Sequence, residues 1–153
     1  MFTASDLRGQ GFLGFVAWSA FAPKEAPDSG GVYVVVHPAT DDPSFALTSC
    51  GGHFKGREPS VGIDVLGRKW LAGVETVYIG KATSLRTRLG QYRSFGAGQP
   101  VGHWGGRYIW QLADPRELRV CWKPSATPEL EESAMLRDFV ASHGSLPFAN
   151  LRH

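Results

Sequence analysis

The sequence has few cysteines, no long apolar run and little net charge. Two of its 153 residues are cysteines, Cys50 and Cys121. They are too few for the disulfide framework of a small secreted protein and suit a reducing compartment. No stretch approaches the roughly 20 apolar residues that a membrane-spanning helix needs, and no repeat or low-complexity segment is present. These absences predict one soluble, cytoplasmic domain over residues 1–153, with no membrane partner.

The apolar N-terminal run "GFLGFVAWSAFAP" is a candidate secretory signal. Asp6 offsets Arg8 in the segment before it, so the positive bias of a signal is missing. Pro23 would directly follow a cleavage site after Ala22. The sequence therefore argues against a signal peptide.

The net charge of +2 is too small to indicate a nucleic-acid partner, but its distribution is uneven. Residues 1–52 carry a net charge of −3, residues 53–107 carry +6 and residues 108–153 carry −1. Such a block is either a solvated surface or a face for an anionic partner.

Three short segments predict strands of an α+β fold. "VYVVVH" (32–37) is β-branched enough for a central strand covered on both faces, and "ETVYIG" (75–80) is its expected partner. "LRVCWK" (118–123) predicts a third strand, and a further short strand is expected in the segment after Ser44. "RYIWQL" fits either a strand or a buried helix.

Capping signals predict three helices. One follows "YIG", one spans about 60–73 with Ser60 as its cap, and one spans about 128–142. The last begins with Thr127 and Pro128, a cap followed by a first-turn proline, and Gly144 ends it.

The helix after "YIG" is rich in arginine. Leu85, Leu89 and Tyr92 form its apolar stripe. Arg88 borders this stripe on one flank, while Arg86 and Arg93 lie on the other. A border arginine is either a surface residue with a packed stem or a functional group near the seam.

The last helix places a carboxylate among apolar residues. Met135, Leu136, Phe139 and Val140 define its apolar face, and Glu132 lies inside that arc. A carboxylate there must be paired or bind a cation, because an unpaired buried charge is costly. An ion pair with Arg88 is the structural alternative, and Glu129 at the edge of the face is the second candidate.

These residues resemble the GIY-YIG endonuclease superfamily. "GVY" at 31–33, "YIG" at 78–80, an arginine ten residues after the second tyrosine, a glutamate in the last helix and a late asparagine occur in the family's order. "YIGKATSLRTRLGQY" is similar to the nuclease corner of the bacterial excision-repair incision subunit. The resemblance implies a small three-stranded antiparallel sheet flanked by helices, and hydrolysis of phosphodiester bonds in DNA with one Mg²⁺ or Mn²⁺ ion.

The resemblance also implies roles for individual residues. Tyr33 and Tyr78 would line the site, with a general base at the first tyrosine or its water; Arg88 would contact the scissile phosphate, Glu132 would bind the metal and Asn150 would orient the site. His103 lies near the place where some members carry a histidine. The residues expected to contact nucleic acid are Lys81, Gly80, Arg86, Arg93, Lys55 and Arg57. Gly80 would let the substrate backbone approach closely.

The chain departs from the family between the two tyrosines, which are 45 positions apart rather than joined by a tight connection. Residues of about 38–73 therefore form an insertion, in which "HFKGREP" could grip a phosphate backbone or serve as a packed lid or dimer surface. Specificity would come from this insertion, from the N-terminal segment, from a homodimer or from a partner protein. DNA is the expected substrate, with RNA as an open alternative.

Two other hypotheses remain open. The chain could be a catalytically weak nucleic-acid-binding module that keeps the fold. Cys50 and His53 could form a zinc site with Cys121 or His103, although their spacing is not that of a paired ligand knuckle.

Overall fold

The protein is an α+β domain built on a four-stranded antiparallel sheet in the order β1-β4-β2-β3. The computed structural model describes residues 2–37 and 42–151. The strands are β1 (Leu13–Ala17), β2 (Gly31–Val36), β3 (Thr76–Ala82) and β4 (Arg119–Pro124). The three expected strands are confirmed within a residue or two, but the expectation of a three-stranded sheet is wrong.

The fourth strand, β1, lies in the apolar run considered as a signal. Its register shifts between Gly14 and Val16, and both Gly14 and Phe15 have positive φ, of 95° and 57°. A Cβ at Gly14 would meet the Trp122 ring at 2.5 Å. This bulged backbone breaks the two-residue alternation, so the strand carries no regular sequence pattern.

All three expected helices are present, and a further short helix, α1, precedes the sheet. The helices are α1 (Ala4–Gly9), α2 (Ile63–Lys69), α3 (Leu85–Gly96) and α4 (Pro128–His143). Gly144 ends α4 in the left-handed conformation at φ 82°, as expected. The helix expected over 60–73 is shorter, because Gly62 rather than Ser60 precedes its first turn and the Ser60 hydroxyl accepts a bond from the Ser49 amide instead. No helix in the described ranges is long and apolar enough to cross a bilayer.

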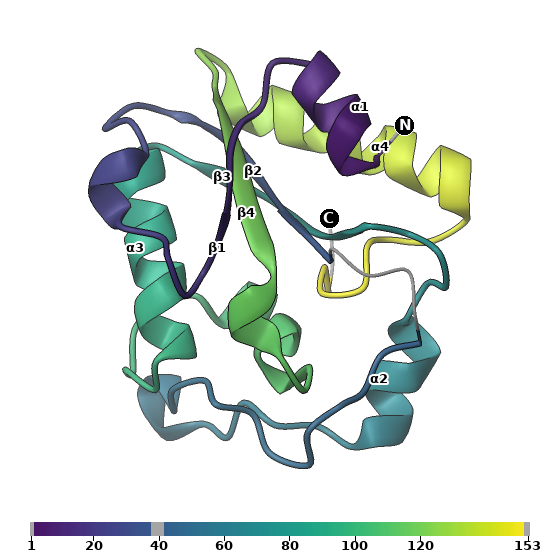
Figure 1. Cartoon of the computed structure of the whole chain (residues 1–153). Coiled ribbons are helices and arrows are strands. Elements are labelled where there is room, and N and C mark those ends of the chain that lie inside the picture. Colours follow the sequence, from purple (N-terminus) through teal and green to yellow (C-terminus); the bar gives the residue numbers. More distant parts are fainter. Residues whose placement is uncertain (1, 38–41, 152–153) are drawn as a thin grey trace.

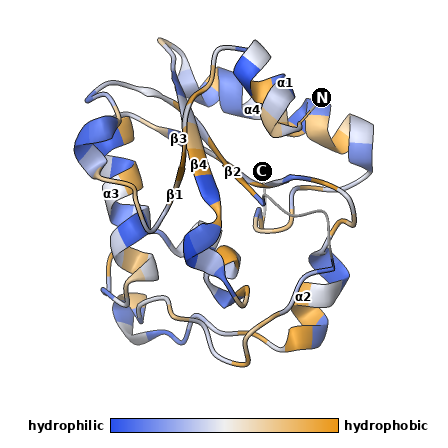
Figure 2. Cartoon of the chain, viewed as in Figure 1, coloured by the Kyte–Doolittle hydropathy of each residue, from blue (hydrophilic) through white to orange (hydrophobic). Residues whose placement is uncertain are grey.

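The helices cover both faces of the sheet. Helices α1 and α4 lie together on one face and α3 lies on the other (Figure 1). Strand β2, between β4 and β3, is buried along its whole length. Apolar residues follow the central strands, and polar and apolar residues alternate along the helices (Figure 2). The strand-to-helix corner from β3 to α3 is thus anchored in the core.

The insertion packs at the C-terminal end of α3 and against a 3-10 segment over Trp104–Gln111, where the Gly52 amide donates to the Phe95 carbonyl and the Cys50 amide donates to the Trp110 carbonyl. That segment corresponds to "RYIWQL", so the strand alternative for it is wrong. Gln111 is fully buried, and its amide bonds both backbone groups of Val61 and the carbonyl of Ala46. The strand expected after Ser44 is reduced to an isolated bridge between Phe45 and Leu112. Residues 38–41 of the insertion lie outside the described ranges.

Candidate active site at the strand-to-helix corner

Tyr33 and Tyr78, the tyrosines of the "GVY" and "YIG" segments, lie on the same face of the sheet. In the β2–β3 register Tyr33 pairs with Gly80 and Val35 pairs with Tyr78. Their rings are 6.0 Å apart between centroids. A Cβ on Gly80 would meet the Tyr33 ring at 2.4 Å. The space beside Gly80 is therefore filled by Tyr33, which differs from the expectation that substrate would approach there.

His103 joins the tyrosines. Its Nε2 lies 2.7 Å from the Tyr33 hydroxyl, and its ring stacks on Tyr92 with centroids 3.5 Å apart. The histidine is fully buried. Tyr92 donates its hydroxyl to the carbonyl of Gly106 at 2.6 Å, which makes it a core residue. The structure thus brings His103 to the predicted site, behind the tyrosines rather than at the surface.

Burial dominates the protonation of this cluster. It raises the pKa of Tyr33 well above its usual value. It raises the pKa of Tyr78 to about 12, while the Arg88 charge lowers it and the Glu132 charge raises it. It also lowers the pKa of His103 well below its usual value, and Arg88 adds to that effect. At neutral pH both tyrosines are protonated and His103 is neutral.

We expect the stability of the protein to fall as pH drops below about 6.5, by up to about 1.4 kcal/mol per pH unit from His103 alone. The pKa of His103 is lower in the folded state, so the unfolded chain takes up the proton first and acidification favours unfolding. Urea unfolding between about pH 7 and pH 5 should show this slope in the wild type and a smaller one in His103→Gln. Equal slopes in both proteins would contradict the assignment.

Arg88 lies on α3 and faces the cluster. Its Nη1 donates to the Gly102 carbonyl at 2.6 Å and lies 3.3 Å from the Gln91 side-chain oxygen. The first bond ties α3 to the segment that carries His103. Glu132, for which an ion pair with Arg88 was the structural alternative, pairs with Lys81, whose Nζ lies 3.9 Å from Glu132 Oε1.

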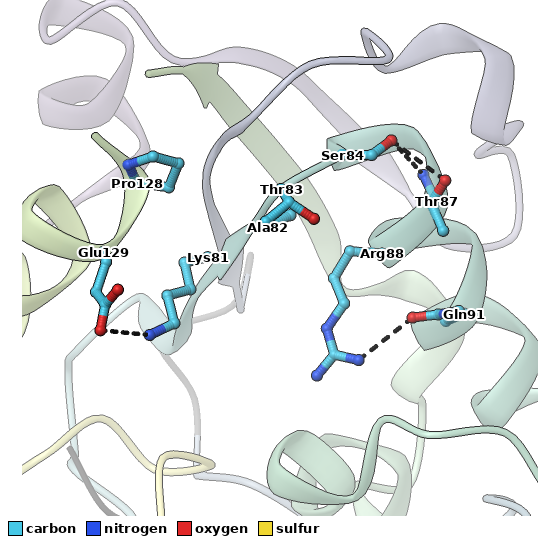
Figure 3. A pocket seen from close by; sticks show the side chains of 9 residues that line it. All are labelled: Lys81, Ala82, Thr83, Ser84, Thr87, Arg88, Gln91, Pro128 and Glu129. Atoms are coloured by element: carbon cyan, nitrogen blue, oxygen red, sulfur yellow. Dashed lines mark hydrogen bonds and ion pairs between the residues drawn. The ribbon is translucent and has the colours of Figure 1, made fainter. Parts of the chain in front are cut away.

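A cavity of about 700 Å³ opens beside Arg88, between β3, α3 and the start of α4. Lys81 projects from β3 and Arg88 projects from α3, and the Glu129 carboxylate on α4 pairs with the Lys81 ammonium group (Figure 3). Its lining residues are Lys81, Ala82, Thr83, Ser84, Thr87, Arg88, Gln91, Pro128 and Glu129. The cavity therefore has two cations and one carboxylate on its walls.

Two carboxylates of α4 approach the same ammonium group. Lys81 Nζ lies 3.9 Å from Glu132 Oε1 and 3.8 Å from Glu129 Oε1. The Glu132 side chain is 18% exposed and that of Glu129 is 83% exposed. This donor set fits one Mg²⁺ or Mn²⁺ ion, because Mg²⁺ is usually held by one or two carboxylates with water and phosphate completing its shell. Glu132 is the stronger candidate, since it is better shielded from solvent.

Asn150 holds the outer edge of β3. Its Oδ1 accepts from the Ile79 amide and its Nδ2 donates to the Ile79 carbonyl, both at 2.9 Å. Ile79 lies between Tyr78 and Gly80, so the asparagine fixes the strand that carries the site. Its side chain fixes the backbone of β3 next to Tyr78.

We expect Asn150→Ala to lower the free energy of unfolding by about 2–4 kcal/mol, because both backbone groups of Ile79 lose their partner in a buried place. Urea unfolding measures the loss. Ser145→Ala, an exposed change in the same tail, should stay within about 0.5 kcal/mol of the wild type. A loss no larger for Asn150→Ala than for Ser145→Ala would contradict this reading.

The remaining predicted contacts lie apart from this cavity. Arg86 donates its Nε to the Ala26 carbonyl, and Arg93 lines a separate cavity with Trp18 and Arg116. Lys55 lies over the Phe54 ring. Arg57 lines a different cavity, beside Tyr78.

The residues of the zinc hypothesis occupy different places. Cys121 is buried on the face covered by α1 and α4, and His103 is bound to Tyr33 on the other face. His53 pairs with Glu58 at 2.9 Å. In residues 2–37 and 42–151 no group of three or more His, Cys, Asp or Glu side chains forms a metal cluster.

Sequence reasoning missed several residues around the corner. Gln91 lies three residues after Arg88 on α3 and orients its guanidinium, a helical spacing that was available as a signal. Trp104 and Arg107 follow His103 closely, but their position beside Tyr78 depends on the fold of the 3-10 segment.

Comparisons with protein-family models, with curated proteins and with solved structures find no match to this chain. The argument for function therefore depends on the resemblance of the motifs and on the geometry of the corner.

Proposed function

We propose that the protein is a metal-dependent endonuclease of the GIY-YIG type that hydrolyses phosphodiester bonds in DNA. The observation that carries the proposal is the convergence at one corner of four residues distant in sequence. Tyr33, Tyr78, Arg88 and Glu132 come from β2, β3, α3 and α4, and the charges of Arg88 and Glu132 both act on Tyr78. A structural ion-pair network would not require the arginine to face two buried tyrosines.

The groups at the corner suit the charge changes of phosphodiester hydrolysis. Arg88 offers a planar fork of donors that can bind two oxygens of a phosphate. The guanidinium is held by Gly102, so little reorganisation is needed as negative charge develops. Lys81 supplies a second cation on the opposite wall of the cavity.

Glu132, with Glu129 beside it, would hold the divalent ion. A bound Mg²⁺ or Mn²⁺ would supply Lewis acid stabilisation of the phosphate and a more acidic water. The Tyr33 hydroxyl is buried against His103, and its raised pKa keeps it protonated at neutral pH. Its role in this site is therefore to position Tyr78 and Arg88. Tyr78 faces the neighbouring cavity and orients water or phosphate through its hydroxyl.

The proposal is tested with supercoiled plasmid, a labelled single strand and the matching RNA strand, each with Mg²⁺, Mn²⁺ or chelator. Nicking that requires the metal supports an endonuclease, and comparison of the strands gives the substrate class. Binding without cutting in every condition would favour the second candidate, a nucleic-acid-binding module that retains the fold.

A further inference from the structure

A second cationic cavity lies next to Tyr78, between the insertion and the 3-10 segment. It measures about 530 Å³. Its lining residues are Arg57, Tyr78, Trp104, Gly105, Arg107, Asn150 and Leu151. Arg57 is the contribution of the insertion, while Tyr78 and Asn150 belong to the proposed catalytic corner.

Two arginines are held against one indole ring in this cavity. The guanidinium carbon of Arg57 lies 4.6 Å from the Trp104 ring centroid, and that of Arg107 lies 4.5 Å from it. Arg107 also donates to the Trp104 carbonyl at 3.1 Å. The indole orients both cations by cation–π attraction, which fixes long side chains that would otherwise be mobile.

The two cations lack acidic partners. Neither Arg57 nor Arg107 forms an ion pair with any carboxylate of the described residues. Burial lowers the pKa of Arg107; Tyr108 raises it, and the positive charge of Arg57, which lies against the same indole ring, lowers it. An anion bound in the cavity would offset the positive charge of both arginines.

We propose that Arg57 and Arg107 bind a phosphate of the nucleic-acid backbone that neighbours the phosphate at the catalytic corner. The forked donors of the two side chains suit phosphate oxygens. A stacked base is a poorer occupant, because the guanidinium groups already contact the ring of Trp104. The identity of the polyanion rests on the proposed function, and the insertion then gains a role in holding substrate.

The test is the affinity of the protein for a labelled DNA strand, measured by fluorescence anisotropy with chelator so that no cutting is needed. Arg57→Gln and Arg107→Gln should each weaken binding about tenfold and reduce the salt slope by about 1. Arg68→Gln is the matched control, since Arg68 lies on the same insertion, is exposed and pairs with Asp64 outside the cavity. It should bind within about twofold of the wild type.

Binding by both cavity variants that equals that of Arg68→Gln would overturn the inference. Arg57 is exposed on a loop, so Arg57→Gln should fold normally and carries the test even if Arg107→Gln unfolds; thermal unfolding checks both. If the cavity variants bind DNA more weakly but the wild type does not cut DNA with any metal, the phosphate site stands and the nuclease proposal is rejected. If the wild type cuts DNA and the cavity variants bind it as tightly as the wild type does, the phosphate site is rejected and the nuclease proposal stands.

Discussion

Replacing Glu132 with glutamine is expected to lower the single-turnover rate of metal-dependent DNA cleavage by about 10³-fold. Glutamine keeps the shape of the side chain but removes the charge that the metal requires. Binding of DNA with chelator should be equal or tighter, because one negative charge near the phosphate is gone. Rates at saturating protein and affinities by anisotropy separate the two effects.

Two neighbouring glutamates provide matched controls for this change. Glu131 pairs with Lys123 at 2.9 Å, and Glu131→Gln should cut at the wild-type rate. Glu129→Gln should lose less than about tenfold, because this exposed carboxylate supplements Glu132. A larger loss of cleavage rate in Glu129→Gln than in Glu132→Gln would mean that Glu129, in the first turn of α4, is the main metal ligand.

Replacing Arg88 with alanine is expected to lower the cleavage rate by about 10³-fold, because the developing charge on the phosphate loses a preorganised partner. Arg88→Lys should recover little of the rate, since an ammonium cannot reproduce the fork that bonds Gly102 and phosphate together. Single-turnover rates at saturating protein measure both variants.

Arg86→Ala separates this chemical role from a general charge effect. Arg86 is on the same helix but bonds the Ala26 carbonyl on the other flank. We expect it to weaken binding by no more than a few fold and to leave the saturated rate unchanged. Equal losses of rate in Arg86→Ala and Arg88→Ala would mean that the helix acts only through its positive charge.

The parts of the fold with regular periodicity could be predicted from the sequence. The apolar run of β2 and the Thr127-Pro128 start and Gly144 stop of α4 are local signals, and each is found where it was expected. Strand β1 could not be predicted in this way. Its bulge at Gly14 depends on the Trp122 ring, which is more than a hundred residues away.

In the candidate site, too, features set by one helix could be predicted from the sequence, whereas contacts between distant segments could not. The helical angle of Glu132 predicted a shielded carboxylate with a cationic partner, and its 18% exposed side chain agrees. The partner itself, Lys81, comes from a different element and was expected elsewhere in the site. The burial of His103 against Tyr92, and the cavity of Arg57 and Arg107, depend on how the insertion folds under α3.

The most direct test of the proposed corner is single-turnover cleavage of a labelled DNA strand by the wild type and Glu132→Gln, with binding of the same strand measured in parallel. The account predicts metal-dependent product from the wild type, almost none from the variant and similar affinity in both. Binding by both proteins with no metal-dependent product from either would contradict it, and the corner would then only hold nucleic acid.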